Sequence, residues 1–155
     1  MPQLLNLKNN SFRITFPGQP IAVRSALARM MEQLNGLDLS SHDRGVIELV
    51  LAEAMNNIVE HAYFGNPDGM VELQITPTDS GLICHLRDDG KPMPEGKAPK
   101  GDRALLDCEM EDLPEGGFGW FLIRDLAYEL NYTRVSGKNL LSFRIAVGQQ
   151  ETREK

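Results

Sequence analysis

The chain has few of the features that mark secreted, disulfide-bonded or membrane-spanning proteins. Only two of its 155 residues are cysteine, Cys84 and Cys108, and their spacing fits neither a metal site nor a disulfide framework. The first residues, MPQLLNLKNN, lack the basic segment and apolar run of a signal peptide. No apolar stretch approaches the roughly 20 residues that span a bilayer. We therefore expect a cytoplasmic protein with reduced thiols and no membrane contact.

Positive charge is also scarce. The chain has 16 Lys and Arg against 22 Asp and Glu, a formal net charge of −6. Because nucleic-acid backbones are bound by clustered Lys and Arg, this balance argues against a nucleic-acid partner. An anionic small ligand stays open, since it needs only a local site. The length predicts one domain over residues 1–155, with a core at about 11–147 and a charged tail at 148–155.

The spacing of apolar residues predicts both strands and helices. Alternation indicates strands, and helical spacing bounded by capping and glycine signals indicates helices. Ser40 and Asp43 resemble a capping box at the start of the second helix. The expected elements are a strand at 11–16, helices at 20–36 and 40–63, a hairpin of strands at 71–76 and 82–88, a helix at 118–130, and strands at 131–135 and 140–147.

This order predicts an α+β fold, a two-layer α/β sandwich whose helices cover one face of a mixed, mostly antiparallel sheet. The first helix carries Met30 and Met31, which suit either an adaptable interface or the core. The stretch before the third helix is rich in Gly, Pro and charge. Such a long loop is usually a lid, a binding loop or disorder, and we place a lid at about 91–116.

Polar residues border the apolar face of the second helix. Glu53, Asn57, Glu60 and His61 fall within one sector of about 100°, and Glu53 and Asn57 lie one turn apart on the same side. A carboxylate beside an amide at the edge of a core suits a general base and an oxygen ligand for Mg²⁺. A solvated polar face with a routine i,i+4 pair is the alternative.

The strand at 82–88 ends on a carboxylate that is in phase with its apolar residues. Because side chains alternate faces, Asp88 shares one side with Leu82, Cys84 and Leu86. A buried carboxylate is costly unless a group donates hydrogen bonds to it. An amino group on a ligand would do so, and Gly90 would let a flat ligand approach the backbone. The alternative is an Asp that turns outward and caps the loop.

Glycines precede the third helix, in the run Gly116-Gly117-Phe118-Gly119. Free backbone N–H groups and the helix dipole at such an entrance favour an anion. The run is neither a P-loop nor a dinucleotide fingerprint, and a flexible hinge is the alternative. Taken in order, the three features supply a general base with a metal ligand, a carboxylate that recognises a nucleobase, and a phosphate cradle.

These three segments resemble a known set of motifs. ELVLAEAMNNIVEHAY resembles the N box of the GHKL ATP-binding superfamily, which includes gyrase B, MutL and the histidine kinases. RDDGKPMP resembles the box with the adenine-reading aspartate, and EGGFGWFLI resembles the glycine box after the ATP lid. Within the superfamily, the chain is most similar to the anti-sigma-factor serine kinases of bacterial partner-switching systems. The resemblance covers about residues 11–147 and implies a Bergerat-type fold.

The resemblance also implies roles for individual residues. Asn57 would hold Mg²⁺ against the phosphates of ATP or ADP, and Glu53 would be the general base on an incoming serine hydroxyl. Asp88 would accept from the adenine amino group, with Gly90 beneath the base. The residues that would face the phosphates are Gly117 and Gly119. His61 would touch a phosphate or orient Asn57, although we favour a structural role at the helix end.

Some positions depart from the family pattern or take no part in it. Pro92 stands where the adenine box often has a second glycine. Glu115 occupies a place that is basic in some members, so phosphate charge would be neutralised by Mg²⁺ and by lid residues Lys97, Lys100 or Arg103. Thr133 and Asn139, on the last two strands, could line the adenine pocket, although we favour ordinary sheet positions for both.

The function implied by the resemblance is that of a serine/threonine-protein kinase. It would phosphorylate an anti-sigma-factor antagonist and bind a sigma factor or another regulator, and a homodimer is possible. The alternative is a nucleotide-gated module that binds partners without useful phosphotransfer. A sensor histidine kinase fragment or a topoisomerase-like ATPase is less favoured, because this sequence shows neither a histidine-bearing dimerisation helix nor a transducer domain.

Overall fold

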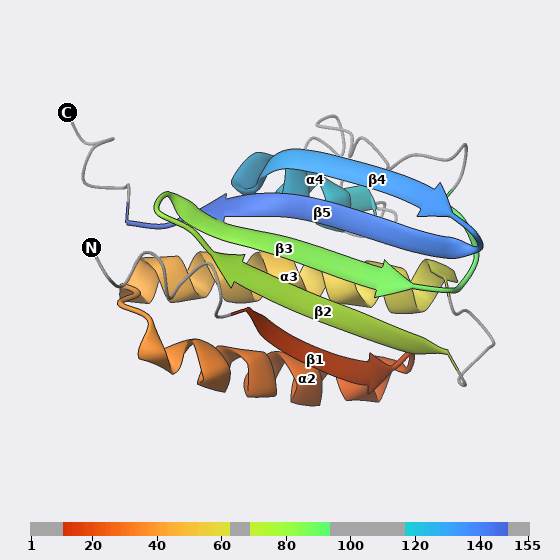
Figure 1. Ribbon diagram of the computed structural model, residues 1–155, viewed down its shortest axis with the longest axis horizontal. Helices are drawn as coiled ribbons and strands as arrows, with labels where there is room; N and C mark the ends of the chain where they lie inside the picture. Colours follow the sequence, from red (N-terminus) through yellow and green to blue (C-terminus); the bar gives the residue numbers. More distant parts are fainter. Residues whose placement is uncertain (1–10, 63–68, 94–116, 149–155) are drawn as a thin grey trace, which may run out of the picture.

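A computed structural model describes residues 11–62, 69–93 and 117–148. Its elements occur in the predicted order (Figure 1). They are β1 (Phe12–Pro17), α2 (Pro20–Gln33), the short 3₁₀ helix η1 (Leu34–Gly36), α3 (Ser41–Ala62), β2 (Met70–Pro77), β3 (Gly81–Asp88), α4 (Gly117–Leu126), β4 (Tyr128–Val135) and β5 (Lys138–Ala146).

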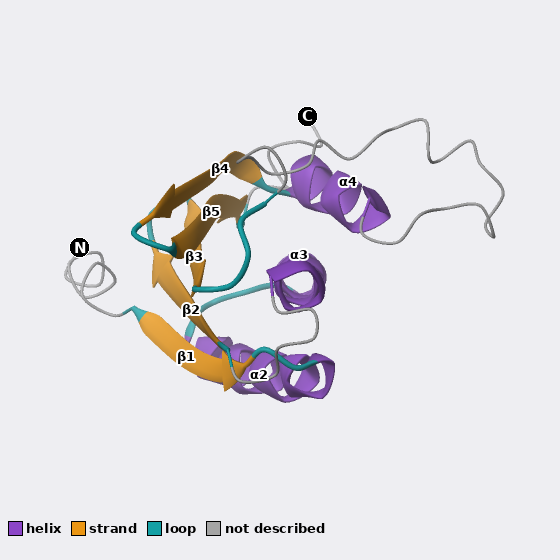
Figure 2. Ribbon diagram, turned by 90° about the vertical axis from the view of Figure 1, so that its right-hand side faces the viewer, coloured by secondary structure: helices purple, strands orange, loops and turns teal. Residues whose placement is uncertain are grey.

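The strands form one sheet in the order β1-β2-β3-β5-β4. All four pairings are antiparallel, so the predicted mixed sheet is wrong for the described strands. The three α-helices lie on one face of this sheet (Figure 2). This arrangement confirms the predicted α+β sandwich of two layers.

The core lies between the sheet and the helices. Every second side chain of β2, β3 and β5 is buried, as the alternation predicts. The predicted apolar face of α3 is fully buried, and so is that of α2 except for the partly buried Leu27. Met30 and Met31 are 0% and 4% exposed, so both belong to the core.

The start of α3 is fixed by the predicted capping box. The Asp43 N–H donates to Ser40 Oγ at 3.0 Å, and the Ser40 N–H donates to Asp43 Oδ2 at 3.2 Å. The Gly148 N–H, just beyond β5, lies 3.3 Å from both carboxylate oxygens of Asp43. A single buried carboxylate therefore caps the helix and holds the end of the last strand beside it.

The boundary between α4 and β4 differs from the prediction. The helix ends at Leu126 and the strand begins at Tyr128, so the expected helix at 118–130 is too long. Glu129 has a φ of 55°, and the β4–β5 register shifts between Tyr128 and Asn131. Apolar residues continue through this boundary without a Gly or Pro to mark it, which is why helical spacing overran the helix.

Candidate functional site

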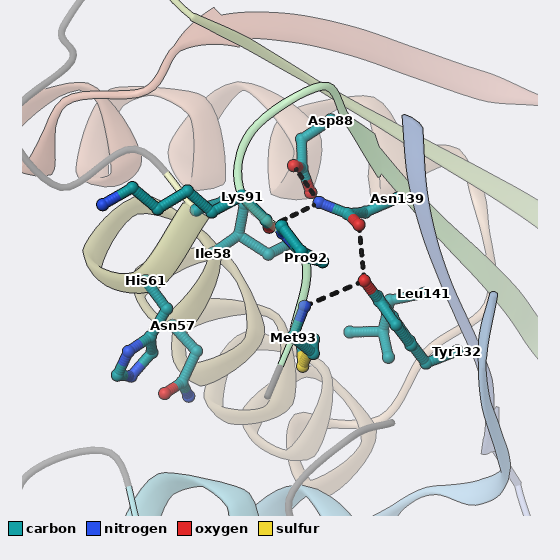
Figure 3. A pocket seen from close by; sticks show the side chains of 11 residues that line it. Asn57, Ile58, His61, Asp88, Lys91, Pro92, Met93, Tyr132, Asn139 and Leu141 are labelled. Atoms are coloured by element: carbon teal, nitrogen blue, oxygen red, sulfur yellow. Dashed lines mark hydrogen bonds between the residues drawn. The ribbon is translucent and has the colours of Figure 1, made fainter. Parts of the chain in front are cut away.

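A hollow of about 310 Å³, partly open to solvent, lies between α3, the segment after β3 and the β4–β5 hairpin. Figure 3 shows Asn57 and His61 at one side of it, and Asp88 with Asn139 at the other. The described residues that line it are Asn57, Ile58, His61, Ala62, Asp88, Lys91, Pro92, Met93, Tyr132, Asn139 and Leu141.

Asp88 faces inward, as its phase on β3 predicts, and is only 5% exposed. Its Oδ1 accepts from the Gly90 N–H at 2.9 Å and from Asn139 Nδ2 at 2.8 Å. Burial raises the pKa of the Asp88 carboxyl above its ordinary value, and these two hydrogen bonds oppose the rise. Neither bond uses Oδ2. The second oxygen is therefore an acceptor that a ligand donor could satisfy.

Gly90 is required here by a close contact within the protein. A Cβ at this position would lie 2.7 Å from the Cβ of Ala62 and closer still to the Ala62 carbonyl oxygen. The next residue, Lys91, donates its N–H to that same carbonyl at 3.0 Å. The glycine thus lets the segment after β3 press against the end of α3. Its missing side chain makes room for the helix end. The predicted approach of a flat ligand to this glycine stays a prediction.

Asn57 is the most unusual polar group of the hollow. It is 3% exposed, and its Nδ2 donates to the backbone carbonyl of Glu53 at 2.7 Å. Its Oδ1 is buried without a hydrogen-bond partner among the described residues. Since buried polar atoms are nearly always paired, this oxygen is a candidate ligand for a cation. The amide meets Glu53 through the backbone and not through the carboxylate.

The Glu53 carboxylate itself is not among the described groups that line the hollow. The residue is partly buried and lies one turn before Asn57. The predicted pair of base and metal ligand is thus adjacent on α3, but only Asn57 faces the hollow.

His61 and Lys91 stand at the solvent side of the hollow. His61 lines it, with a half-exposed side chain whose Nε2 lies 3.9 Å from Glu60 Oε1. No hydrogen bond at the helix end holds the imidazole among the described residues, so the structural role that we favoured has no support. Lys91 also lines the hollow and is exposed. The predicted side chains that would neutralise phosphate charge were Lys97, Lys100 or Arg103, later in the chain. These three residues and Glu115 lie outside the described residues.

Sequence reasoning missed Tyr132 and weighed Asn139 as a pocket residue without favouring that role. Asn139 is 4% exposed and lines the hollow, so its interpretation as an ordinary sheet position is wrong. The signal was present, because Asn139 is in phase with the inward-facing Leu141 and Phe143 of β5, as Asp88 is with the apolar residues of β3. Thr133, by contrast, is exposed, as expected of a surface sheet position.

The predicted glycine cradle forms the first turn of α4. The helix begins at Gly117, so Gly117 and Gly119 both belong to that turn. The first four N–H groups of a helix have no partner inside it, and they include those of both glycines. Figure 2 shows α4 beside α3, and the two helices are in contact. Gly116 and most of the predicted lid lie outside the described residues.

The donor set fits Mg²⁺ better than a metal held by protein alone. The described residues contain no group of three or more His, Cys, Asp or Glu side chains that could hold a metal ion. Mg²⁺ commonly takes one or two protein oxygens together with water and substrate phosphates. The unpaired Oδ1 of Asn57 supplies one such oxygen.

Comparison with known proteins identifies the class of this fold and site. The model of the family described as "Histidine kinase-like ATPase domain" matches residues 16–145. The chain belongs to this family of ATPase domains, which implies ATP or ADP as its nucleotide. The resemblance to the GHKL superfamily is thereby confirmed.

Two curated relatives represent two kinds of kinase. The chain is 29% identical over 103 residues to the serine/threonine-protein kinase BtrW of Bordetella bronchiseptica, covering 66% of this chain and 70% of BtrW. It is 27% identical over 125 residues to blue-light-activated histidine kinase 2 of Erythrobacter litoralis, covering 77% of this chain. BtrW agrees with the predicted likeness to serine kinases. The chain spans about a third of the blue-light-activated kinase, 32% of its length.

Solved structures support the fold. The RsbU and RsbW domains of Rv1364c from Mycobacterium tuberculosis match with a TM-score of 0.57 at 16% identity, over 89% of this chain and 32% of that one. The blue-light-activated histidine kinase EL346 of Erythrobacter litoralis matches with a TM-score of 0.54 at 24% identity, over 85% of this chain and 44% of that one. Within the described part of the chain, no helix is both long and apolar enough to cross a membrane.

Proposed function

We propose that the hollow binds Mg-ATP and Mg-ADP, with the base at Asp88 and the phosphates toward Asn57. Two acceptors that are unused among the described residues, Asp88 Oδ2 and Asn57 Oδ1, lie across one hollow of an ATPase-family domain, and this observation carries the proposal. An adenine amino group would donate to Asp88. The carboxamide oxygen of Asn57 would hold Mg²⁺, which when bound neutralises phosphate charge.

The remaining predicted contacts follow from this orientation. The N–H groups of Gly117 and Gly119 would bind phosphate oxygens, because a helix N-terminus favours anions. His61 and Lys91 would add donors at the solvent side of the hollow. Gly90 would act indirectly, since its close approach to Ala62 fixes the segment that follows Asp88.

We further propose that the protein is a serine/threonine-protein kinase. In the transfer step the oxygen of a serine or threonine hydroxyl would bond to the terminal phosphorus as the bond to the bridging oxygen of ADP breaks. Glu53 would take the hydroxyl proton. The relative BtrW is named a serine/threonine-protein kinase, which supports this activity. The substrate would be an anti-sigma-factor antagonist, and a sigma factor or other regulator would be the second partner.

The alternative function is a nucleotide-gated module that binds partners without useful phosphotransfer. The position of Glu53 favours it, because the carboxylate is not among the described groups lining the hollow. In this case ATP and ADP would only select which partner is bound, and a second copy of the chain is one possible partner. Both functions require the same nucleotide site.

Phosphotransfer from radiolabelled ATP separates these functions. The purified protein is incubated with candidate antagonist proteins encoded by the same genome, and the acid and alkali stability of any labelled residue is measured. Acid-stable label on serine or threonine, lost in Glu53→Gln at unchanged ATP affinity, supports the kinase with Glu53 as base. Acid-labile label would indicate histidine phosphorylation. No label on any candidate, with partner affinity that differs between ATP and ADP, would support the binding module.

A further inference from the structure

Three side chains of the β4–β5 hairpin hold the segment that follows β3. Asn139 Nδ2 donates to Asp88 Oδ1 at 2.8 Å and to the Lys91 carbonyl at 2.9 Å. Arg134 Nη1 donates to the Gly90 carbonyl at 2.9 Å. The Met93 N–H donates to the Tyr132 hydroxyl at 3.0 Å. The hairpin therefore binds the side chain of Asp88 and the backbone of Gly90, Lys91 and Met93. Figure 3 shows the bonds made by Asn139 and Tyr132.

Asn139 is the centre of this cluster. Its Oδ1 accepts from the Tyr132 hydroxyl at 2.5 Å and from Arg134 Nη1 at 2.7 Å. A guanidinium can only donate and an ionised carboxylate can only accept. The carboxamide oxygen must therefore face Arg134, and its nitrogen must face Asp88. Two neighbours thus fix the orientation of the amide.

The hydrogen-bonding capacity of Asn139 is used up inside the protein. A carboxamide has two donor hydrogens and two acceptor lone pairs. The two hydrogens point to Asp88 and Lys91, and the two lone pairs receive Tyr132 and Arg134. No group remains to contact a ligand, although the residue lines the hollow. Any effect of Asn139 on a bound ligand must pass through the groups that it holds.

We propose that Asn139 is a positioning residue that orients Asp88 toward the base of a purine nucleotide, with Tyr132 and Arg134 holding Asn139 in place. The proposal rests on the nucleotide site proposed above. By binding Oδ1, Asn139 and the Gly90 N–H turn the other oxygen, Oδ2, to the ligand. The cluster would thereby set the preference for a purine that carries an amino group. If the Asp88 carboxylate were misaligned, it would lose its hydrogen bond to that amino group. The purine would then keep only contacts that do not depend on the amino group.

The test compares ATP with inosine triphosphate, which has an oxygen in place of the amino group. Dissociation constants are measured by calorimetry on the full chain with Mg²⁺. A hydrogen bond to a charged group corresponds to a preference of about 10- to 100-fold, and we expect wild type to favour ATP within this range. In Asn139→Leu the ratio should fall to within about threefold of unity. Loss of stability alone would weaken both nucleotides equally and leave the ratio unchanged.

Arg134→Gln is the second variant, because the exposed Arg134 can be replaced without disturbing the core. It should lower the ATP preference partway by releasing the Asn139 amide. Thr133→Ala, on the same strand but exposed and outside the hollow, is the matched control and should keep the wild-type ratio. The proposal is overturned if both Asn139→Leu and Arg134→Gln keep the wild-type ratio of the two dissociation constants. If Asn139→Leu does not fold, a wild-type ratio in Arg134→Gln alone overturns it.

Amide hydrogen exchange in the nucleotide-free protein tests the positioning separately. Tyr132→Phe should speed exchange of the Met93 amide, and Asn139→Leu that of the Gly90 amide, each by roughly fivefold, the factor for one hydrogen bond. Amides of β2, such as that of Leu73, should not change in either variant. Unchanged exchange at both sites would overturn the positioning role. If wild type binds neither nucleotide, the proposed function fails, and exchange alone then decides whether the cluster holds the segment.

Discussion

Helix α3 buries two polar side chains, one in its first turn and one in its second half, and they differ in whether their polar atoms have hydrogen-bond partners. Asp43, at the start, is 4% exposed and receives hydrogen bonds from Ser40 and Gly148. Asn57, in the second half, is 3% exposed, yet its carboxamide oxygen has no partner among the described residues. Burying an unpaired polar atom costs about 1–3 kcal/mol. The first residue therefore stabilises the fold, and we infer that the second leaves an acceptor available to a ligand.

The largest effect is expected from changing Asn57. In Asn57→Leu the oxygen that would hold Mg²⁺ is gone, so Mg-ATP affinity should fall by about 100-fold, which corresponds to about 2.7 kcal/mol. The nucleotide-free domain should be as stable as wild type or more so, because the unpaired buried oxygen is removed. Calorimetric titration and urea unfolding measure the two quantities. A variant that loses stability but keeps Mg-ATP affinity would show that Asn57 is structural.

Asp43→Ala should show the opposite pattern. The loss of a helix cap typically costs about 1–2 kcal/mol, and this carboxylate also holds Gly148. We expect the urea midpoint to fall accordingly at unchanged denaturant dependence, with ATP affinity within about twofold of wild type. Ser41→Ala, one residue after the Ser40 cap and exposed, is a matched control on the same turn. If Asp43→Ala impaired nucleotide binding as strongly as Asn57→Leu, the division between the two ends of α3 would be wrong.

The smallest effect is expected from Asp88, whose Oδ1 accepts two hydrogen bonds while neither of them uses Oδ2. Its folded-state pKa is raised by burial, so the folded protein holds the proton more tightly than the unfolded chain. Ionisation thus removes stability as pH rises from the unfolded pKa of about 3.9 through the raised folded value. Asp88→Asn should remove this dependence and match or exceed wild-type stability at neutral pH.

Urea unfolding at several pH values checks this sign. The stability of Asp88→Asn relative to wild type should grow as pH rises from about 4 to neutral. A wild type that gains stability relative to Asp88→Asn over this range would contradict the cost assigned to burial of the carboxylate.

Patterns of neighbouring residues were sufficient to predict most helices and strands, and to predict that Asp88 faces inward. The inward phase of Asp88 and the capping box at Ser40 and Asp43 depend on residues close in sequence, and the structure confirms both. The contact between Asp88 and Asn139 joins residues 51 positions apart. It exists because β3 pairs with β5, and a single sequence does not reveal that strand order.

The features that sequence reasoning did not anticipate have the same physical origin. The role of Gly90 depends on the end of α3, which approaches only in the folded chain. The end of α4 depends on a backbone turn at Glu129, a residue type that seldom adopts a positive φ. Neither is encoded by the spacing of apolar residues.

Thermal unfolding with Mg-ATP and Mg-ADP, on wild type and on Asp88→Ala, tests the nucleotide site most directly. Ligand at about 100 times its dissociation constant adds roughly 2.7 kcal/mol to the stability of the folded state, which raises the midpoint of a domain of this size by roughly 5–10 °C. We predict this rise in wild type and its loss in Asp88→Ala. An equal rise in both proteins, or none in wild type, would contradict the assignment of this hollow to ATP.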